Sequence, residues 1–272
     1  MLIAQITDTH IKLPGRLAYK KVDTAAMLRR CVAELQALKP QPDLILFTGD
    51  LVDLGRPEEY AHLKEILAPL PQRIIAIPGN HDSRDSMRAA FAPEGYLPPD
   101  GFLQFAIDDD YPLRIVGLDT LVPGEGGGEL CGERLGWLDR TLAQRPDAPT
   151  LVMMHHPPFV TGIGHMDKIG LKGREGFAEI MARHPQVQLI LCGHLHRVIR
   201  ADVGGRPALT CPSPAHQVAL DIDENAPSCF CMEPPGFMLH WWHDGQLVTH
   251  TAVIGDYDGP HPFFDANGNL ID

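Results

Sequence analysis

The sequence predicts an α/β protein whose C-terminal part is rich in β-strands. Short apolar, β-branched runs alternate with helical patterns through the first two thirds of the chain, as in stacked βαβ units. After His196 the pattern changes to short β runs with turns at Gly204-Gly205 and Asp244-Gly245. The length of 272 residues suits one large layered domain or a core with a smaller appended unit.

The expected elements follow one another regularly up to residue 192. Apolar runs predict strands at 2–7, 43–48, 73–77, 103–107, 113–118, 151–154 and 187–192. Apolar residues at spacings of three and four from Leu28 to Leu38 predict a helix that ends before Pro40. Further helices are expected at 57–70, 133–143 and 174–183. After His196 we expect a second, mostly β sheet without a helix.

One acidic, Pro-rich segment, residues 221–235, resembles neither a strand nor a helix. A lid, an interface loop and a flexible excursion all remain open for it. Six cysteines are scattered along the chain without zinc-site spacing, and a local or intermolecular disulfide of Cys229 and Cys231 stays open.

Composition and charge exclude several classes of protein. With 44% hydrophobic and 21% charged residues, the chain is typical of a globular protein. A net charge of -12 argues against a stable nucleic-acid partner held by a basic surface, but not against a small anionic substrate, because bound cations invert the local potential. No stretch reaches the roughly 18 apolar residues of a membrane span, so we expect a cytoplasmic protein without a membrane partner.

Residues of metal-ligating types follow the ends of five predicted strands. In open α/β sheets these ends build ligand sites, so the five clusters should converge. The residues are Asp8 and His10, then Asp50, then Asn80 with His81 and Asp82, then His155 with His156, and finally His194 and His196.

Oxygen and imidazole ligands without thiolate suit Mn, Fe, Co or Zn, and a shared carboxylate can hold two ions about 3.5 to 4 Å apart. Gly49, Gly79 and Gly193 each precede a ligand, where a β-carbon would crowd the approach. Each cluster alone also fits a plain turn, a helix cap or a surface pair. Their joint placement at successive strand ends favours the metal site.

In this order the motifs resemble those of the calcineurin-like metallophosphoesterases, over residues 1 to about 200. A closer resemblance, to the bacterial glycerophosphodiesterase and class III cyclic nucleotide phosphodiesterase branch, lies in the runs at 55–60, 77–82, 154–158 and 215–218. The resemblance implies a four-layer αββα sandwich of two mixed β-sheets with a C-terminal β-rich cap segment. Residues 1–200 would form the dinuclear core. Residues 201–272 would add second-sheet strands and a cap and oligomerisation segment of the same domain, in a homo-oligomer.

The resemblance also implies roles for single residues. One ion would take Asp8, His10, Asp50 and His196, and the other Asp50, Asn80, His155 and His194, with Asp50 as the bridge. His81 matches the catalytic histidine, and Asp82 would fix its orientation. Asn80, His81 and His216 would bind the substrate, with His216 reaching its phosphate, and His156 would support the ligands or the structure.

The sequence therefore predicts a phosphodiesterase that hydrolyses glycerophosphodiesters or 3′,5′-cyclic nucleotides. The expected reaction is attack of a metal-bridging hydroxide on phosphorus, with His81 stabilising charge or protonating the departing alkoxide. A phosphomonoesterase, a nuclease of the same fold and a non-catalytic scaffold are the alternatives. No Arg cluster is evident to clamp a dianionic phosphate, which favours a diester over a monoester.

Overall fold

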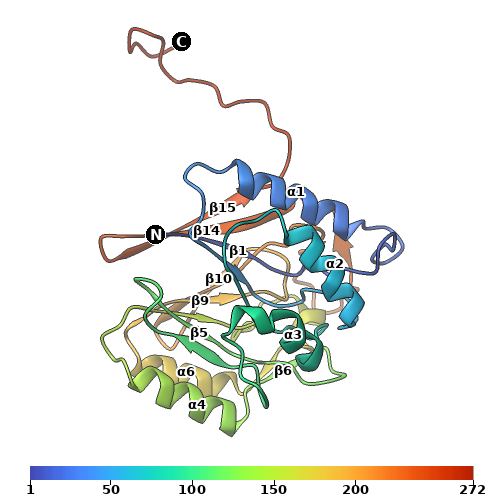
Figure 1. Ribbon diagram of the computed structural model, residues 1–272, viewed down its shortest axis with the longest axis vertical. Coiled ribbons are helices and arrows are strands. Elements are labelled where there is room, and N and C mark those ends of the chain that lie inside the picture. The colour runs from blue at the N-terminus through green and yellow to red at the C-terminus, as the bar shows by residue number, and fades with distance from the viewer. Residues whose placement is uncertain (272) are drawn as a thin grey trace.

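The computed structural model describes residues 1–271, which form two β-sheets packed face to face (Figure 1). The first sheet is mixed and has the order β15-β14-β1-β2-β3. Its strands are β1 (Leu2–Ile6), β2 (Leu44–Phe47), β3 (Ile74–Ala76), β14 (Gly236–His243) and β15 (Gln246–Val253). Strands β1, β2 and β3 are parallel, and β14 adds to β1 antiparallel.

The second sheet is also mixed and has the order β10-β11-β9-β7-β5-β4. Its strands are β4 (Phe105–Ile107), β5 (Arg114–Gly117), β7 (Thr150–Met153), β9 (Val187–Cys192), β10 (Ile199–Val203) and β11 (Arg206–Thr210). The four inner strands β5, β7, β9 and β11 run parallel, while β4 and β10 close the edges antiparallel.

Alternation of side chains along the strands separates the four layers. Ile45 and Phe47 of β2 pack under helices α1 (Thr24–Ala37), α2 (Pro57–Leu67) and α3 (Arg84–Phe91), whereas Leu44 and Leu46 face the second sheet. Likewise Val152 of β7 packs against α4 (Gly132–Ala143) and α6 (Arg174–Arg183). The four-layer αββα arrangement that the sequence predicts is therefore confirmed.

All the strands and helices predicted up to residue 192 are present, with ends shifted by a few residues. The sequence pattern missed several short elements because each has too few residues for a periodicity. They are α3, the 3-10 turn η1 (Ala92–Glu94), α5 (Gly164–Asp167), β6 (Gly128–Glu129) and β8 (Leu171–Lys172).

The residues after His196 do not form the expected second, mostly β sheet by themselves, so that expectation needs correction. As expected, residues 197–271 contain no helix. Strands β10 and β11 extend the second sheet, whereas β14 and β15 extend the first one, and only the short pair β12 (Gln217–Val218) and β13 (Phe230–Cys231) stands apart. The buried His240 of β14 contacts the Gln5 side chain of β1, so the C-terminal strands share the core of the N-terminal ones. The sequence pattern shows strands but not their partners.

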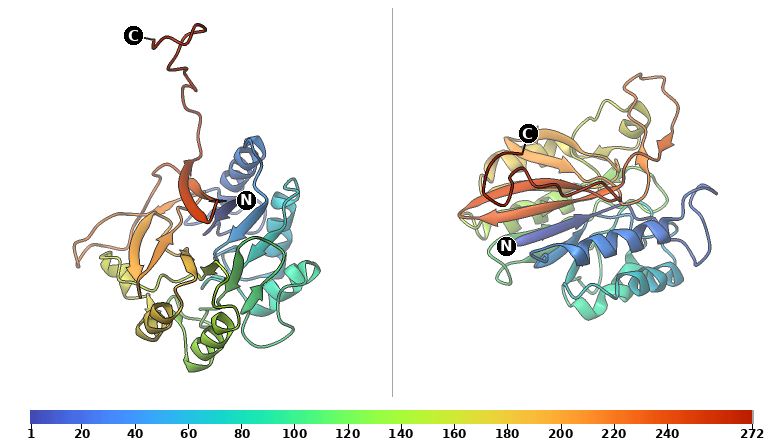
Figure 2. Two further views of the ribbon diagram at one scale, coloured as in Figure 1. Left: turned by 90° about the vertical axis from the view of Figure 1, so that its left-hand side faces the viewer. Right: turned by 90° about the horizontal axis from the view of Figure 1, so that it is seen from above.

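Both glycine-containing hairpin turns occur where the sequence places them. Gly204 and Gly205 join β10 to β11, and Asp244 and Gly245 join β14 to β15, all with positive φ. Beyond β15 the chain leaves the body of the domain as an extended arm, residues 255–271 (Figures 1 and 2). Within residues 1–271, no helix combines the length and the apolar character that crossing a membrane requires.

Candidate metal centre

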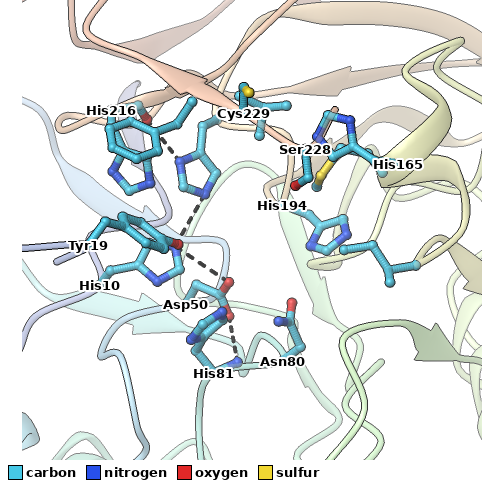
Figure 3. Close-up of a pocket in the computed structure, with 15 residues that line it drawn as sticks. His10, Tyr19, Asp50, Asn80, His81, His165, His194, His216, Ser228 and Cys229 are labelled. Atoms are coloured by element: carbon cyan, nitrogen blue, oxygen red, sulfur yellow. Dashed lines mark hydrogen bonds and ion pairs between the residues drawn. The ribbon is translucent and has the colours of Figure 1, made fainter. Parts of the chain in front are cut away.

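The five clusters of metal-ligating residues converge at one edge of the two sheets, as the sequence predicts. Figure 3 shows His10, Asp50, Asn80 and His194 of these clusters around one cavity. Each side chain comes from a loop that directly follows a parallel strand. The loop after β1 carries Asp8 and His10, that after β2 carries Asp50, that after β3 carries Asn80, that after β7 carries His155, and that after β9 carries His194 and His196. All seven are buried except Asn80, which is half-buried.

The backbone at this edge is unusually strained. Five of the seven residues adopt the left-handed region, with φ of 51° at Asp8, 44° at His10, 49° at Asp50, 69° at His194 and 54° at His196. Non-glycine residues rarely adopt this conformation, and it costs of order 1–3 kcal/mol each. The loops hold one another in it, because Asp8 N–H donates to Gly49 O and His10 N–H donates to Asp50 O. Such strain is typical of functional sites.

Two overlapping groups of donor atoms share the carboxylates of Asp8 and Asp50. In the first, Asp8, His10 and His196 each place one ligand atom within 4.8 Å of the others. His10 Nε2 lies 3.2 Å from His196 Nε2 and 3.7 Å from Asp50 Oδ2. In the second, His155 Nε2 lies 3.4 Å from Asp50 Oδ2.

Asn80 and His194 complete the second group. Asn80 Oδ1 lies 3.1 Å from His155 Nε2. The ring of His194 lies 5.2 Å from that of His155, centre to centre, and borders the same cavity. Asp50 lies next to ligand atoms of both groups, which is the position of a bridging carboxylate.

With the histidine rings neutral, as metal binding requires, the groups at the centre are hydrogen-bond acceptors that face one another. His155 donates from Nδ1 to Thr48 O at 2.8 Å, and His196 donates from Nδ1 to the carbonyl of His216 at 2.9 Å. In the neutral rings both Nε2 atoms therefore present lone pairs, next to two carboxylates. Buried lone pairs that converge in this way are satisfied by a cation, so the residues fit a metal centre.

Burial and the neighbouring charges shift the pKa values of these residues in different directions. Burial lowers the pKa of His155, but the carboxylates of Asp50 and Asp8 outweigh it and raise that pKa to about 9. Burial raises the pKa of Asp50, yet the neighbouring His155, His81 and His10 bring it well below its ordinary value. In His10 and His194 burial dominates and holds the pKa well below the ordinary value.

His81 lies beside this centre, with its ring 4.6 Å from that of His10. Its Nδ1 donates to the backbone carbonyl of Asp53 at 2.8 Å, which leaves Nε2 as the free nitrogen of the ring. Burial lowers the pKa of His81, but Asp50 and the Asp53 carbonyl raise it above the ordinary value.

The expected role of Asp82 as the orienting partner of His81 needs correction, because its carboxylate bonds elsewhere. It accepts from the backbone N–H groups of Gly79 and Leu51 at 2.9 and 3.2 Å, and from the Tyr60 hydroxyl at 2.7 Å. Asp82 thus joins the loop after β3 to the loop after β2. Asp82 follows His81 in the sequence, but its carboxylate does not hydrogen-bond to the His81 ring.

A cavity of about 360 Å³ opens above the ligand residues. His216, which the resemblance assigns to substrate, lines it, and burial together with His81 lowers the pKa of His216 to about 4. The rings of Tyr19 and Phe230 meet the His216 ring edge to face, with centre-to-centre distances of 5.3 and 5.2 Å. No sequence motif indicates these two aromatic residues or His165, although Tyr19 lies on the loop that follows Asp8 and His10.

The acidic segment that the sequence left unassigned forms one wall of this cavity. Ser228, Cys229 and Phe230 line it, and the neighbouring Cys231 belongs to β13. All six cysteines are free thiols, so Cys229 and Cys231 do not form a disulfide with each other.

His156 connects the glycine-rich loop at 124–128 to the centre. Its Nδ1 lies 2.8 Å from the Thr120 hydroxyl, and its Nε2 donates to Gly126 O at 3.1 Å. The ring lies 4.5 Å from that of His194, centre to centre. The glycine-rich loop at 124–128 is thus fixed behind the second group of donors.

The chain is similar in sequence to known proteins over most of its length. The family model of calcineurin-like phosphoesterases matches residues 1–198. The probable glycerophosphodiester phosphodiesterase GpdQ of Arcobacter nitrofigilis is 43% identical over 274 residues, covering 100% of both chains. The 3′,5′-cyclic adenosine monophosphate phosphodiesterase CpdA of Escherichia coli K12 is 32% identical and covers 93% of this chain and 90% of its own.

Among solved structures, a dimetal phosphatase from Danio rerio superposes with a TM-score of 0.67 at 15% identity, covering 94% of this chain and 97% of its own. At that identity the likeness shows the fold alone. The family match and the full-length relatives show more, and the chain belongs to the calcineurin-like phosphoesterase family.

Proposed function

We propose that this protein hydrolyses small phosphodiesters, either glycerophosphodiesters or 3′,5′-cyclic nucleotides, at a centre of two divalent ions. The observation that carries the proposal is the convergence of buried carboxylates and imidazole lone pairs below an open cavity. One ion would bind Asp8, His10, Asp50 and His196, and the other Asp50, Asn80, His155 and His194. The two full-length relatives are named for these two kinds of substrate.

Divalent ions bound there would activate water and neutralise phosphate oxygens. The chain itself supplies orientation and a proton. His81 holds Nδ1–H on the Asp53 carbonyl, so its Nε2 is available to the departing oxygen, and Asp50 and the Asp53 carbonyl raise its pKa, which favours the role of proton donor. His216, kept neutral by its lowered pKa, would contact the phosphate without adding charge.

The charge of the cavity favours a diester over a monoester. The residues that line it include histidines, aromatic and apolar side chains, but neither a lysine nor an arginine in the described part of the chain. A diester carries one negative charge, which two metal ions can neutralise. A monoester dianion commonly takes additional Arg or Lys contacts, and no such side chain borders this cavity.

The test is the initial rate of the Mn²⁺-reconstituted protein on bis(4-nitrophenyl) phosphate and on 4-nitrophenyl phosphate, beside a chelator-treated control. We expect metal-dependent turnover that is faster on the diester. Faster monoester turnover would make the protein a phosphomonoesterase, and no turnover on either would make it a scaffold.

A second set of rates then identifies the substrate. We expect turnover of glycerophosphoethanolamine or of 3′,5′-cyclic AMP under the same conditions. Cleavage of a single-stranded oligonucleotide in preference to both would instead indicate a nuclease.

We also propose that the chain forms a homo-oligomer through its C-terminal arm, residues 255–271. The arm projects from the domain (Figure 2) and carries large apolar side chains that are mostly exposed, with Phe263 at 79% and Leu270 at 63%. Apolar side chains on an extended segment gain free energy when a neighbouring subunit covers them. Light scattering should show an oligomer for the full chain and a monomer after truncation at residue 254. A monomeric full chain would refute the proposal.

A further inference from the structure

The imidazole of His10 has a second nitrogen whose partner the ligand set does not explain. Nε2 faces His196 and Asp50, but Nδ1 is buried and makes no hydrogen bond within residues 1–271. An unpaired buried N–H costs about 1–3 kcal/mol. If Nε2 binds a metal ion, Nδ1 carries the proton and needs an acceptor.

Asp53 offers the nearest charged acceptor. Its Oδ1 lies 3.8 Å from His10 Nδ1, and its side chain is 12% exposed. The two residues are neighbours because the loops after β1 and β2 continue side by side: Asp53 N–H donates to Ile11 O at 3.1 Å. The other carboxylate oxygen, Oδ2, pairs with the Lys12 ammonium. The Asp53 carboxylate is thus fixed between a cation and the free nitrogen of His10.

Asp53 also touches the catalytic side of the centre through its backbone. Its carbonyl accepts the hydrogen bond from His81 Nδ1 at 2.8 Å. Ligand atoms of His10, Asp53 and His81 all lie within 4.8 Å of one another. A single residue therefore contacts one expected metal ligand with its side chain and the expected catalytic histidine with its main chain.

We propose that Asp53 is a positioning residue of the metal centre, whose carboxylate accepts the Nδ1–H of His10 and thereby orients Nε2 toward the ion. The inference rests on the proposed two-metal site. Metal-ligating histidines commonly donate their other N–H to a carboxylate, which fixes the tautomer and makes the ligating nitrogen more basic. Loss of such a partner typically weakens metal binding about 10- to 100-fold.

The test is equilibrium titration of the chelator-treated protein with Mn²⁺, without substrate, against a competing chelator. Asp53→Asn removes the charge and keeps the shape. We expect it to lower the affinity for the ion that His10 ligates about 10- to 100-fold. The affinity for the other ion should stay within about threefold of the parent chain's. Asp53→Glu keeps a carboxylate on a longer side chain. It should lower the affinity for the same ion less than Asp53→Asn does.

Lys12→Met is the matched control, because it removes the same ion pair but leaves the carboxylate beside His10. We expect its affinity for both ions to stay within about threefold of the parent chain's. If the ion pair had only a structural role, Lys12→Met would instead weaken binding as Asp53→Asn does. Urea unfolding of each chelator-treated variant verifies that the fold is retained. If Asp53→Asn does not fold, the Glu and Met variants decide the question.

Two results would overturn the inference: unchanged binding of both ions in the Asn and Glu variants, or equal weakening in Lys12→Met. Failure of the proposed function gives a different pattern. If the parent chain binds fewer than two ions, the metal site itself is wrong, whatever the variants do. If it binds two ions but turns over no ester, the assignment of Asp53 still stands.

Discussion

The carboxylate of Asp50 accepts a hydrogen bond from the backbone N–H of His81 at 2.9 Å. The proposed bridging ligand therefore also holds the loop that carries the proposed catalytic histidine. Oδ1 accepts this bond, whereas Oδ2 faces His10 Nε2 and His155 Nε2. One oxygen therefore holds the loop of His81, and the other faces the ligand atoms of both groups.

Asp50→Ala should lose metal as well as rate, because it removes a ligand from both groups and frees the His81 loop. We expect less than one ion per chain by atomic emission after dialysis, and turnover reduced to the background of the chelated protein. Asp43→Ala, a change at an exposed acidic residue before β2, is a control that should keep both ions. Two ions in the Asp50 variant would refute its bridging role.

His81→Ala should separate chemistry from metal binding. The ring borders the centre but is not in either ligand set, so both ions should remain. Loss of a general acid typically lowers turnover about 10²- to 10⁴-fold. The comparison is kcat at saturating Mn²⁺ beside the metal content of the same sample. Full turnover in this variant would contradict the role that we assign to His81.

Tyr60→Phe tests the connection that Asp82 makes between the loop after β2 and the loop after β3. The Tyr60 hydroxyl is buried and donates to Asp82 Oδ1 at 2.7 Å, and a hydrogen bond to a charged group contributes about 1.5–3 kcal/mol. We expect the free energy of unfolding to fall by about that amount in urea titrations. The Tyr96→Phe variant loses hydrogen bonds to the backbone of Ala76 in β3 and leaves the bonds of Asp82 in place, so it should be destabilised without losing activity. Activity should fall in the Tyr60 variant.

Gly79→Ala should damage the centre because of a close approach, not because of backbone strain. A β-carbon at Gly79 would lie 2.8 Å from Asp50 Cγ, where real β-carbons do not approach. We expect lower metal occupancy and lower stability. Gly132→Ala, where an added β-carbon meets nothing within 4 Å, should keep both properties. Normal metal content in the Gly79 variant would show that the loop can shift.

Much of the fold and the site is predictable from local patterns. Apolar runs predict the strands. Asp8, His10 and Asp50 directly follow such strands, which predicts that they meet at one edge of the sheet. What the sequence missed depends on contacts between distant segments. No local pattern shows that β14 pairs with β1, or that the Asp53 carbonyl rather than the Asp82 carboxylate holds the His81 ring.

His240 gives a prediction for acid stability outside the metal centre. Burial lowers its pKa from 6.5 to about 3. Its Nε2 lies 3.0 Å from Gln5 Oε1 and its Nδ1 lies 2.9 Å from the Thr249 hydroxyl, so the neutral ring has a partner at both nitrogens, and burial disfavours the charged ring. Between these two pKa values the unfolded chain binds a proton that the folded chain does not. The stability that the neutral ring contributes is therefore complete above pH 6.5 and is lost as the pH falls toward 3.

His240→Gln should remove this acid sensitivity while keeping polar partners for Gln5 and Thr249. Each unit of pH in that window corresponds to about 1.4 kcal/mol, so the loss between pH 6.5 and 4.5 should be about 2–3 kcal/mol smaller in the variant. Urea unfolding of chelated protein at several pH values measures it, with the exposed His243→Gln on the same strand as control. The free energy of unfolding could instead fall with pH equally in the parent chain and in His240→Gln. That result would show that His240 takes up its proton in the folded chain, because the strand pair of β1 and β14 can open locally to admit water.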